Sequence, residues 1–380
     1  PAPASPAPDP ATEAQDHLPG LDGVRALALI AVLIFHAAPD LLPGGFIGVE
    51  VFFVVSGFII TRGLLTEWRQ TGRIDLRRFW VRRARRLLPA LALLLAGVVT
   101  YVAVAHPDEL GALRTDVLAV VGYVMNWRLV LGSDSYFESF VAPSPLRHLW
   151  SLAIEEQFYL LWPLLLVVGL KLLRPRFLLP FILLGAVGSL FAMAWLHDAG
   201  ATDARLYYGT DLRAAGLLLG SALAFVYHGG SGRCRIAALA IDLVAVGGVA
   251  LLTALTLLLT ESGSLLYAGG FALVDVAAVA VIVAACRSGT VVARLLSLQG
   301  GAAVVLAALS YRLVERPIHA LGFGGALRAT RTTLTANNWR RAGSVGAGAR
   351  SFTMISGLVL ALAFPAQAQL PHFDHESIRL

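Results

Sequence analysis

An arginine and a histidine stand eleven residues apart in the first long apolar run of the chain, residues 21–38. At about 100° per residue, Arg25 and His36 differ by only about 20° around a helix axis, so both lie on one face. Ionisable side chains inside a membrane span are costly, which makes both residues functional candidates. Arg25 could hold an anionic substrate while His36 moves a proton. Alternatively, the arginine snorkels to the membrane surface and the histidine is hydrogen-bonded within a helix bundle.

Acidic and hydroxyl side chains occur in two further apolar segments. Glu155 and Glu156 are adjacent in WSLAIEEQFYLLWP, and neighbouring helix positions point about 100° apart. One of the two carboxylates can therefore face a bundle interior, where it could orient His36 as a general base or form a structural ion pair. Ser56, in GVEVFFVVSGFII, could be a nucleophile or a small residue that allows close helix packing.

A basic segment precedes another apolar run. Arg83 and Arg86 stand three residues apart in FWVRRARRLLPA, share a helix face and could hold a phosphate bidentately. A basic anchor for anionic lipid headgroups is the alternative. Eight arginines lie between residues 69 and 86, which is the strongest signal in the sequence for a cytoplasmic loop.

The composition identifies the elements that must position these residues. Of the 380 residues, 57% are hydrophobic and 14% are charged, against roughly 45–50% and 25% in soluble domains. Crossing a membrane takes about 20 mostly apolar residues, and such runs recur along the chain. We therefore expect an all-α fold, a polytopic bundle of about ten transmembrane helices without a soluble catalytic domain. The expected spans cover residues 21–38, 46–66, 87–105, 116–131, 150–170, 177–196, 212–228, 241–260, 265–286 and 296–316, with a further candidate at 352–368.

Three segments are expected along the chain. Residues 1–17 are rich in proline and alanine and should form a disordered tail. The membrane domain should cover residues 18–318, and its first apolar run should remain as a helix because it lacks a small-residue cleavage site. Residues 319–380 have the composition of a basic linker that includes the extra candidate span.

The charge of the loops predicts the orientation of the chain. The arginine segment at 69–86 should be cytoplasmic, which places the N-terminus in the cytoplasm as well. The same rule places the loops around residues 171–176 and 233–235 inside. Residues 116–131 then cannot be a simple crossing, so either they are re-entrant or one of these loop assignments is wrong.

Charge and cysteine content exclude other classes of protein. The net charge of +6 comes almost wholly from arginines gathered between apolar runs rather than among aromatic residues, so nucleic acid is not an expected partner. Cys234 and Cys286 are far apart and have no CxxC spacing, which indicates neither a metal site nor a disulfide framework. Asp275 is the remaining isolated acid in an apolar run, and no motif accounts for it.

Six segments in a fixed order resemble the membrane-bound acyltransferase-3 family. They are LDGVRALALIAVLIFH, GGFIGVEVFFVVSGFII, FWVRRARRLLPA, the Asn-Trp pair at 126–127, HLWSLAIEEQFYLLWP and SYRLVERPI, and together they extend over residues 18–318. The resemblance implies an O-acyltransferase that moves an acyl group, acetyl above all, from acyl-CoA to a hydroxyl of a carbohydrate, lipid or secondary-metabolite acceptor. It also implies a multi-pass protein of the cell membrane that needs no cofactor beyond acyl-CoA as co-substrate.

The resemblance also implies roles for single residues. His36 matches the family's catalytic histidine, which would act as general base on the acceptor hydroxyl, and Arg25 matches the arginine of the same motif. Arg83 and Arg86 match the family's RxxR pair, which would bind phosphates or polarise the thioester carbonyl. Glu155 matches the first acid of the WSLxxEEQFY segment, and we infer that it orients His36. The expected site thus comprises the catalytic residues Arg25, His36 and Glu155 and the substrate-binding residues Ser56, Arg83, Arg86, Glu156 and Tyr311.

Two departures from the family pattern leave other functions open. Glu50 stands where the family usually has aspartate. A late span with a Tyr-Leu-Trp-His-Trp-Pro-like run should lie between residues 299 and 308 and is absent. The chain could therefore be an inactive, truncated family member. A second alternative is a proton- or anion-coupled transporter in which Arg25, His36 and Glu155 line the path, although no inverted repeat supports it.

Overall fold

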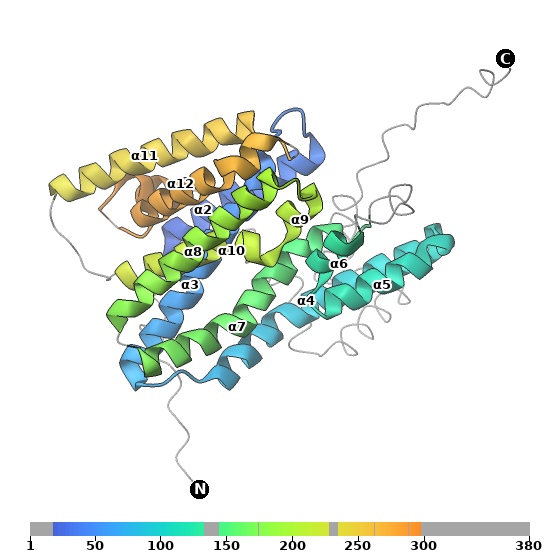
Figure 1. The fold of residues 1–380 in the computed structure, drawn as a ribbon, viewed down its shortest axis with the longest axis horizontal. Helices are drawn as coiled ribbons and strands as arrows, with labels where there is room; N and C mark the ends of the chain where they lie inside the picture. Colours follow the sequence, from blue (N-terminus) through green and yellow to red (C-terminus); the bar gives the residue numbers. More distant parts are fainter. Residues whose placement is uncertain are drawn as a thin grey trace, which may run out of the picture. The chain divides into compact units, whose positions relative to one another are not determined.

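The computed structural model describes residues 18–132, 144–173, 175–227, 235–261, 263–287 and 289–297, and every regular element in these ranges is a helix (Figure 1). The long helices are α2 (Pro19–Ala37), α3 (Gly48–Thr71), α4 (Leu76–Ala105), α7 (Trp150–Leu172), α8 (Pro175–Asp198), α10 (Thr210–Val226), α11 (Arg235–Leu258) and α12 (Phe271–Ala285). The short ones are η1 (Gly45–Ile47), η2 (Pro107–Glu109), α5 (Leu110–Val121), α6 (Met125–Gly132), η4 (Arg147–Leu149), α9 (Asp203–Tyr208) and η5 (Leu266–Gly270).

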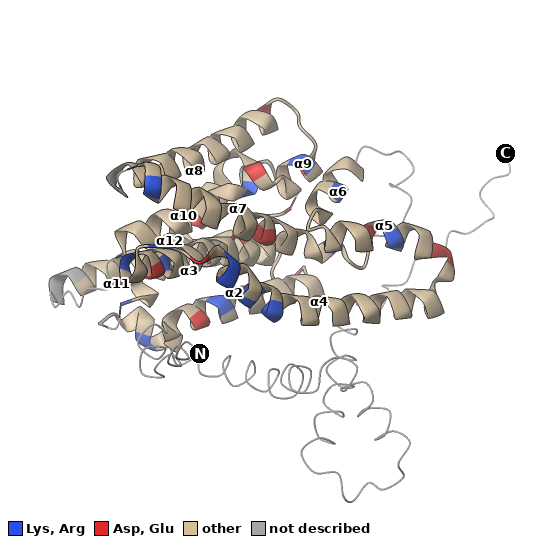
Figure 2. Ribbon diagram, turned by 90° about the horizontal axis from the view of Figure 1, so that it is seen from below, with Lys and Arg blue, Asp and Glu red and all other residues tan. Residues whose placement is uncertain are grey.

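Eight helical segments in the described part of the chain are long and apolar enough to cross a membrane. Figure 2 shows one of them, α8, with a long stretch that carries no charged side chain. The expected all-α membrane fold is therefore confirmed. The eight segments are Pro19–Ala37, Gly45–Thr71, Leu76–Ala105, Arg147–Leu172, Phe177–Asp198, Asp203–Val226, Ala238–Leu258 and Leu266–Ala285.

Several expected features lie outside the described residues. They include the N-terminal tail, Tyr311, and the point near residue 300 where the family's late span is missing. The same holds for the linker at 319–380, the candidate span at 352–368 and almost all of the expected span at 296–316.

Residues 116–131 form two short helices rather than one span. Helix α5 ends in a Schellman motif, in which Val124 N donates to Ala119 O (2.8 Å) and Tyr123 N donates to Val120 O (3.0 Å). Tyr123 has a positive φ of 54°, the left-handed conformation that this motif requires. The backbone therefore turns in the middle of this apolar run, which agrees with the expectation that residues 116–131 are not a simple crossing.

The chain divides into two compact units. Of the described residues, the larger comprises those within 18–80, 119–132 and 149–297, and the smaller comprises 81–118 and 144–148. In the larger unit α3 packs along α10, α11 packs along α12, and α2 packs on both α3 and α12 (Figure 1). Most of α4 and α5 belongs to the smaller unit.

Glycines bring α3 and α10 into close contact. A Cβ atom at Gly57 would overlap the backbone carbonyl of Leu217, and one at Gly220 would overlap the carbonyl of Val54. Lipid provides no hydrophobic force between helices, so close packing of small residues is a main source of helix association in a membrane. The sequence motif VVSGFII thus has a packing role through Gly57.

A buried hydrogen-bonded chain joins the same two helices to α7. Trp162 Nε1 donates to Thr61 Oγ1 (2.8 Å), and Thr61 Oγ1 donates to Ser221 Oγ (2.9 Å). Ser221 in turn donates to the carbonyl of Leu217 on its own helix (2.8 Å). Every hydroxyl and the indole N–H in this chain has a partner, as a water-poor interior requires.

Substitution of Gly220 by alanine should destabilise the protein. The added methyl group meets the α3 backbone, which cannot move as a flexible side chain would. We expect a loss of about 1–3 kcal/mol, as for other overpacked interiors, measured as a lower melting temperature in detergent. Gly63→Ala is the matched control, because a Cβ atom there has no neighbour within 4 Å. Equal melting temperatures for the two variants would contradict this account of α3–α10 packing.

Candidate functional site

Glu155 on α7 is the centre of a small polar cluster. Its Oε1 accepts a hydrogen bond from Ser56 Oγ on α3 (3.1 Å), and its Oε2 accepts one from Tyr159 OH (3.1 Å). Glu155 and Tyr159 are four residues apart and so share a face of α7. The structure therefore brings together two of the predicted site residues, Ser56 and Glu155, and adds Tyr159 to them.

His36 lies in the last turn of α2 with its ring exposed. Its Nδ1 lies 2.8 Å from the carbonyl oxygen of Val32. A carbonyl oxygen only accepts, so this hydrogen bond places a hydrogen on Nδ1, and in the neutral ring the lone pair is then on Nε2. That tautomer is the one a general base needs, and the backbone of α2 holds it.

The structure records no hydrogen bond or ion pair between His36 and Glu155 among the described residues. The carboxylate instead accepts from Ser56 and Tyr159. The role of Glu155 as the group that orients His36 therefore stays a prediction. In the structure the carbonyl of Val32 orients the ring.

The predicted arginines lie apart from this cluster in the chain. Arg25 sits about 16 Å from His36 along the axis of α2, and it forms an ion pair with Asp22, one turn away at 3.8 Å. Arg83 and Arg86 lie on the part of α4 that belongs to the smaller unit, and Arg86 is exposed. Their spacing places both on one side of α4, and their role as phosphate binders stays a prediction.

The acid beside Glu155 has a separate position on α7. Glu156 is half-buried next to Glu155, and successive helix positions diverge by about 100°. Its predicted substrate-binding role stays a prediction.

A second polar network involves the amide side chains of Asn126 and Gln157. Gln157 Nε2 donates to Asn126 Oδ1 (2.9 Å) and to the carbonyl of Tyr123 (2.7 Å). Thr210 Oγ1 donates to Gln157 Oε1 (2.6 Å), and Asn126 Nδ2 donates to the carbonyl of Tyr208 (3.0 Å). The network joins α6, α7 and the start of α10. The glutamine of EEQFY and the asparagine of the Asn-Trp pair are thus positioning groups.

Arg213 is a buried arginine that none of the sequence motifs singles out. Arg213 on α10 forms an ion pair with Glu50 on α3, 2.6 Å between Nη2 and Oε2, and both side chains are at most 2% exposed. Asp275 on α12, for which the sequence offered no motif, lies against the same Glu50. The sequence feature that could have identified this group is the position of Arg213 in an apolar run, because an arginine inside a membrane requires acidic partners.

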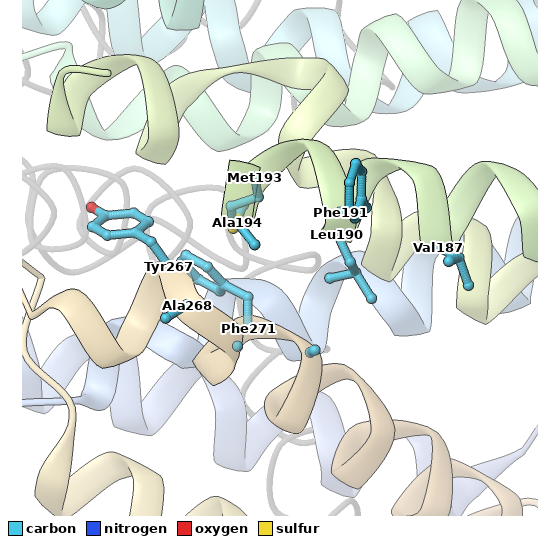
Figure 3. Close-up of a pocket in the computed structure, with 10 residues that line it drawn as sticks. Val187, Leu190, Phe191, Met193, Ala194, Tyr267, Ala268 and Phe271 are labelled. Atoms are coloured by element: carbon cyan, nitrogen blue, oxygen red, sulfur yellow. The ribbon is translucent and has the colours of Figure 1, made fainter. Parts of the chain in front are cut away.

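An apolar pocket of about 270 Å³ opens between α8 and the η5–α12 segment (Figure 3). The residues that line it are Val187, Leu190, Phe191, Met193 and Ala194 of α8 and Tyr267, Ala268, Gly269, Phe271 and Ala272 of the η5–α12 segment. Gly269 has a φ of 154°, which glycine tolerates and other residues rarely adopt, and this interrupts the helix beside the pocket. The pocket can accommodate an apolar group, but it offers no general base.

Metal and cysteine chemistry have no support in the described residues. No group of three histidine, cysteine, aspartate or glutamate side chains in this part of the chain is placed to hold a metal ion. Cys286, just after α12, is buried, and burial raises the pKa of its thiol to about 12. A thiol with so high a pKa is a poor nucleophile at neutral pH.

Comparison with known proteins gives one family. A family model described as an acyltransferase domain matches residues 18–311. The chain is 37% identical to the O-acetyltransferase OatA of Staphylococcus aureus (strain NCTC 8325 / PS 47) over 286 residues, which are 74% of this chain and 47% of the relative.

Two further relatives match a shorter part of the chain. The peptidoglycan O-acetyltransferase OatA of Listeria monocytogenes is 48% identical over 213 residues, 56% of this chain and 34% of the relative. The putative peptidoglycan O-acetyltransferase YrhL of Bacillus subtilis is 44% identical over 217 residues, 57% of this chain and 34% of the relative. The chain thus spans about a third to a half of the length of these relatives. No solved structure matches it.

Replacing Gln157 by alanine should destabilise the larger unit. The substitution leaves the fully buried amide of Asn126 and the hydroxyl of Thr210 short of a partner. We expect a cost of about 1–3 kcal/mol for the groups left unsatisfied, seen as a lower melting temperature. Gln70→Ala, at an exposed position of α3, is the matched control. An unchanged melting temperature for Gln157→Ala would show that the network contributes nothing.

Proposed function

The chain belongs to the membrane-bound acyltransferase-3 family, whose model it matches over residues 18–311, and from this premise we propose that it is an O-acetyltransferase with peptidoglycan as acceptor. The single observation that carries the acceptor is the similarity to relatives named peptidoglycan O-acetyltransferases. The same similarity favours acyl transfer over ion-coupled transport. We further propose acetyl-CoA as the donor, which the family resemblance implies.

In the proposed reaction His36 acts as the general base. Its Nε2 accepts the proton of the acceptor hydroxyl as the hydroxyl oxygen attacks the thioester carbonyl. The carbon–sulfur bond then breaks, and the proton passes from His36 to the departing thiolate of CoA. The hydrogen bond from Nδ1 to Val32 supports this role, because it keeps Nε2 free to accept a proton.

The arginines are proposed to handle the negative charge of the donor. Arg83 and Arg86 have the spacing of a phosphate-binding pair and stand at the start of a long apolar helix. Arg25 has a weak ion pair at 3.8 Å and a half-exposed side chain, so it has capacity to bind an anionic or developing negative charge. A water-poor site also protects the thioester from hydrolysis.

We propose that the N-terminus of the chain lies in the cytoplasm and that the spans cross the membrane in alternating directions. Eight alternating spans place the arginine-rich loops on one side of the membrane when α4 ends, and the span Arg147–Leu172 begins, on the opposite side. These loops are the turn before α4, the α7–α8 connection and the α10–α11 connection. The positive-inside rule makes that side cytoplasmic. His36, at the end of α2, then lies toward the outer side.

The test is release of free CoA by membranes that contain this chain, with acetyl-CoA as donor and peptidoglycan fragments as acceptor. His36→Ala should lower the rate by about 10²–10⁴-fold, the usual contribution of a general base. His197→Ala is the matched control. His197 lies in the last turn of α8, and the hydrogen bond that its ring forms with a described residue is to Ser264. A His36→Ala protein with the parent rate would overturn the proposed mechanism.

A further inference from the structure

Three ionisable side chains from three helices meet in the apolar interior of the larger unit. They are Glu50 on α3, Arg213 on α10 and Asp275 on α12, with 2%, 1% and 0% of their surfaces exposed. We refer to Glu50, Arg213 and Asp275 as the buried trio. The proposed transfer reaction uses none of them. Their burial must therefore be explained by the interactions of these three side chains with one another and with their surroundings.

Aromatic rings enclose the guanidinium of Arg213. Its Cζ lies 3.7 Å from the centre of the Phe271 ring and 5.4–5.7 Å from the centres of the Phe53, Trp150 and Tyr207 rings. Its Nη2 lies 2.6 Å from Glu50 Oε2. The positive charge is thus balanced by cation–π contacts and by carboxylate, with no solvent beside it. Tyr207 is the other ionisable side chain in contact with the guanidinium among the described residues.

The two carboxyl groups of the trio face each other. A Cβ atom at Gly216 would lie 2.5 Å from Glu50 Oε1 and 2.8 Å from Asp275 Oδ1, so both oxygens approach the same point of α10. Glu50 and Asp275 are in hydrogen-bonding position. No donor from another described residue reaches either oxygen of Asp275.

Charge counting then requires a proton. Ionised carboxylates only accept hydrogen bonds, so two of them can bond each other only when one carries a proton. Two carboxylates and one guanidinium would leave a net negative charge in a low-dielectric interior, which is strongly unfavourable. One bound proton makes the trio neutral and supplies the missing donor.

We propose that the buried trio is an internal proton site. It holds one proton, shared between Glu50 and Asp275, and either carboxylate can act as the counter-ion of Arg213. Loss of one carboxyl group therefore removes the shared proton and leaves a neutral ion pair. Loss of both leaves Arg213 charged and without a counter-ion.

The first test removes the charges of the trio by substitution in the full chain. The melting temperature of each variant in detergent is measured. Glu50→Gln and Asp275→Asn should each melt close to the parent. The double variant should lose on the order of 10 °C, because an unpaired buried charge is costly, or should fail to accumulate. Adding Arg213→Met to the double variant makes the trio neutral again and should restore most of the loss.

The second test detects the proton itself by infrared absorption. The parent should show the C=O band of a protonated carboxyl group at neutral pH, and Glu50→Gln and Asp275→Asn should each remove it. Asp198→Asn, at an exposed position of α8, is the matched control and should keep the band. The proposal is overturned if the band is absent from the parent or survives in both single variants. It is also overturned if one single variant alone is as unstable as the double variant.

Discussion

The structure depends on the rule that a buried charge must find its partner inside the protein. Arg213 is the largest fully buried side chain of the described residues, and lipid offers it no water. Its contacts with Glu50 and the surrounding aromatic rings fix where α3 and α10 must lie. The close approach of Gly57 and Gly220 then brings the two backbones together along the rest of their length. Helices α2, α7, α8 and α12 pack on one or both of these two helices.

The same rule separates the groups that hold the fold from those available for chemistry. Asn126, Gln157 and Thr210 satisfy one another, and their hydrogen-bonding capacity is used up in joining helices. His36 differs, because its one hydrogen bond is to its own helix and leaves Nε2 available at an exposed position. A base at a helix end beside a rigid bundle can meet a substrate without disturbing the core.

The spans were predictable because hydrophobic length alone decides them, and eight of the expected runs are long helices. The turn at Tyr123 was not, because a tyrosine with positive φ leaves no mark on apolar periodicity. Arg213 stands at the edge of the expected span 212–228, where an arginine is expected to snorkel. The two acids beside it, Glu50 and Asp275, are each more than 60 residues away in the chain. The contact of Ser56 with Glu155 likewise depends on how α3 and α7 are rotated, which spacing within one helix does not encode.

The most direct measurement is the product formed when this chain, in vesicles, receives labelled acetyl-CoA and peptidoglycan fragments. Mass spectrometry of the fragments identifies whether a sugar hydroxyl has been acetylated. The account predicts ester-linked label on the fragments, dependent on the presence of the chain. Fragments that stay unlabelled while the folded chain releases CoA to water or to another acceptor would contradict it.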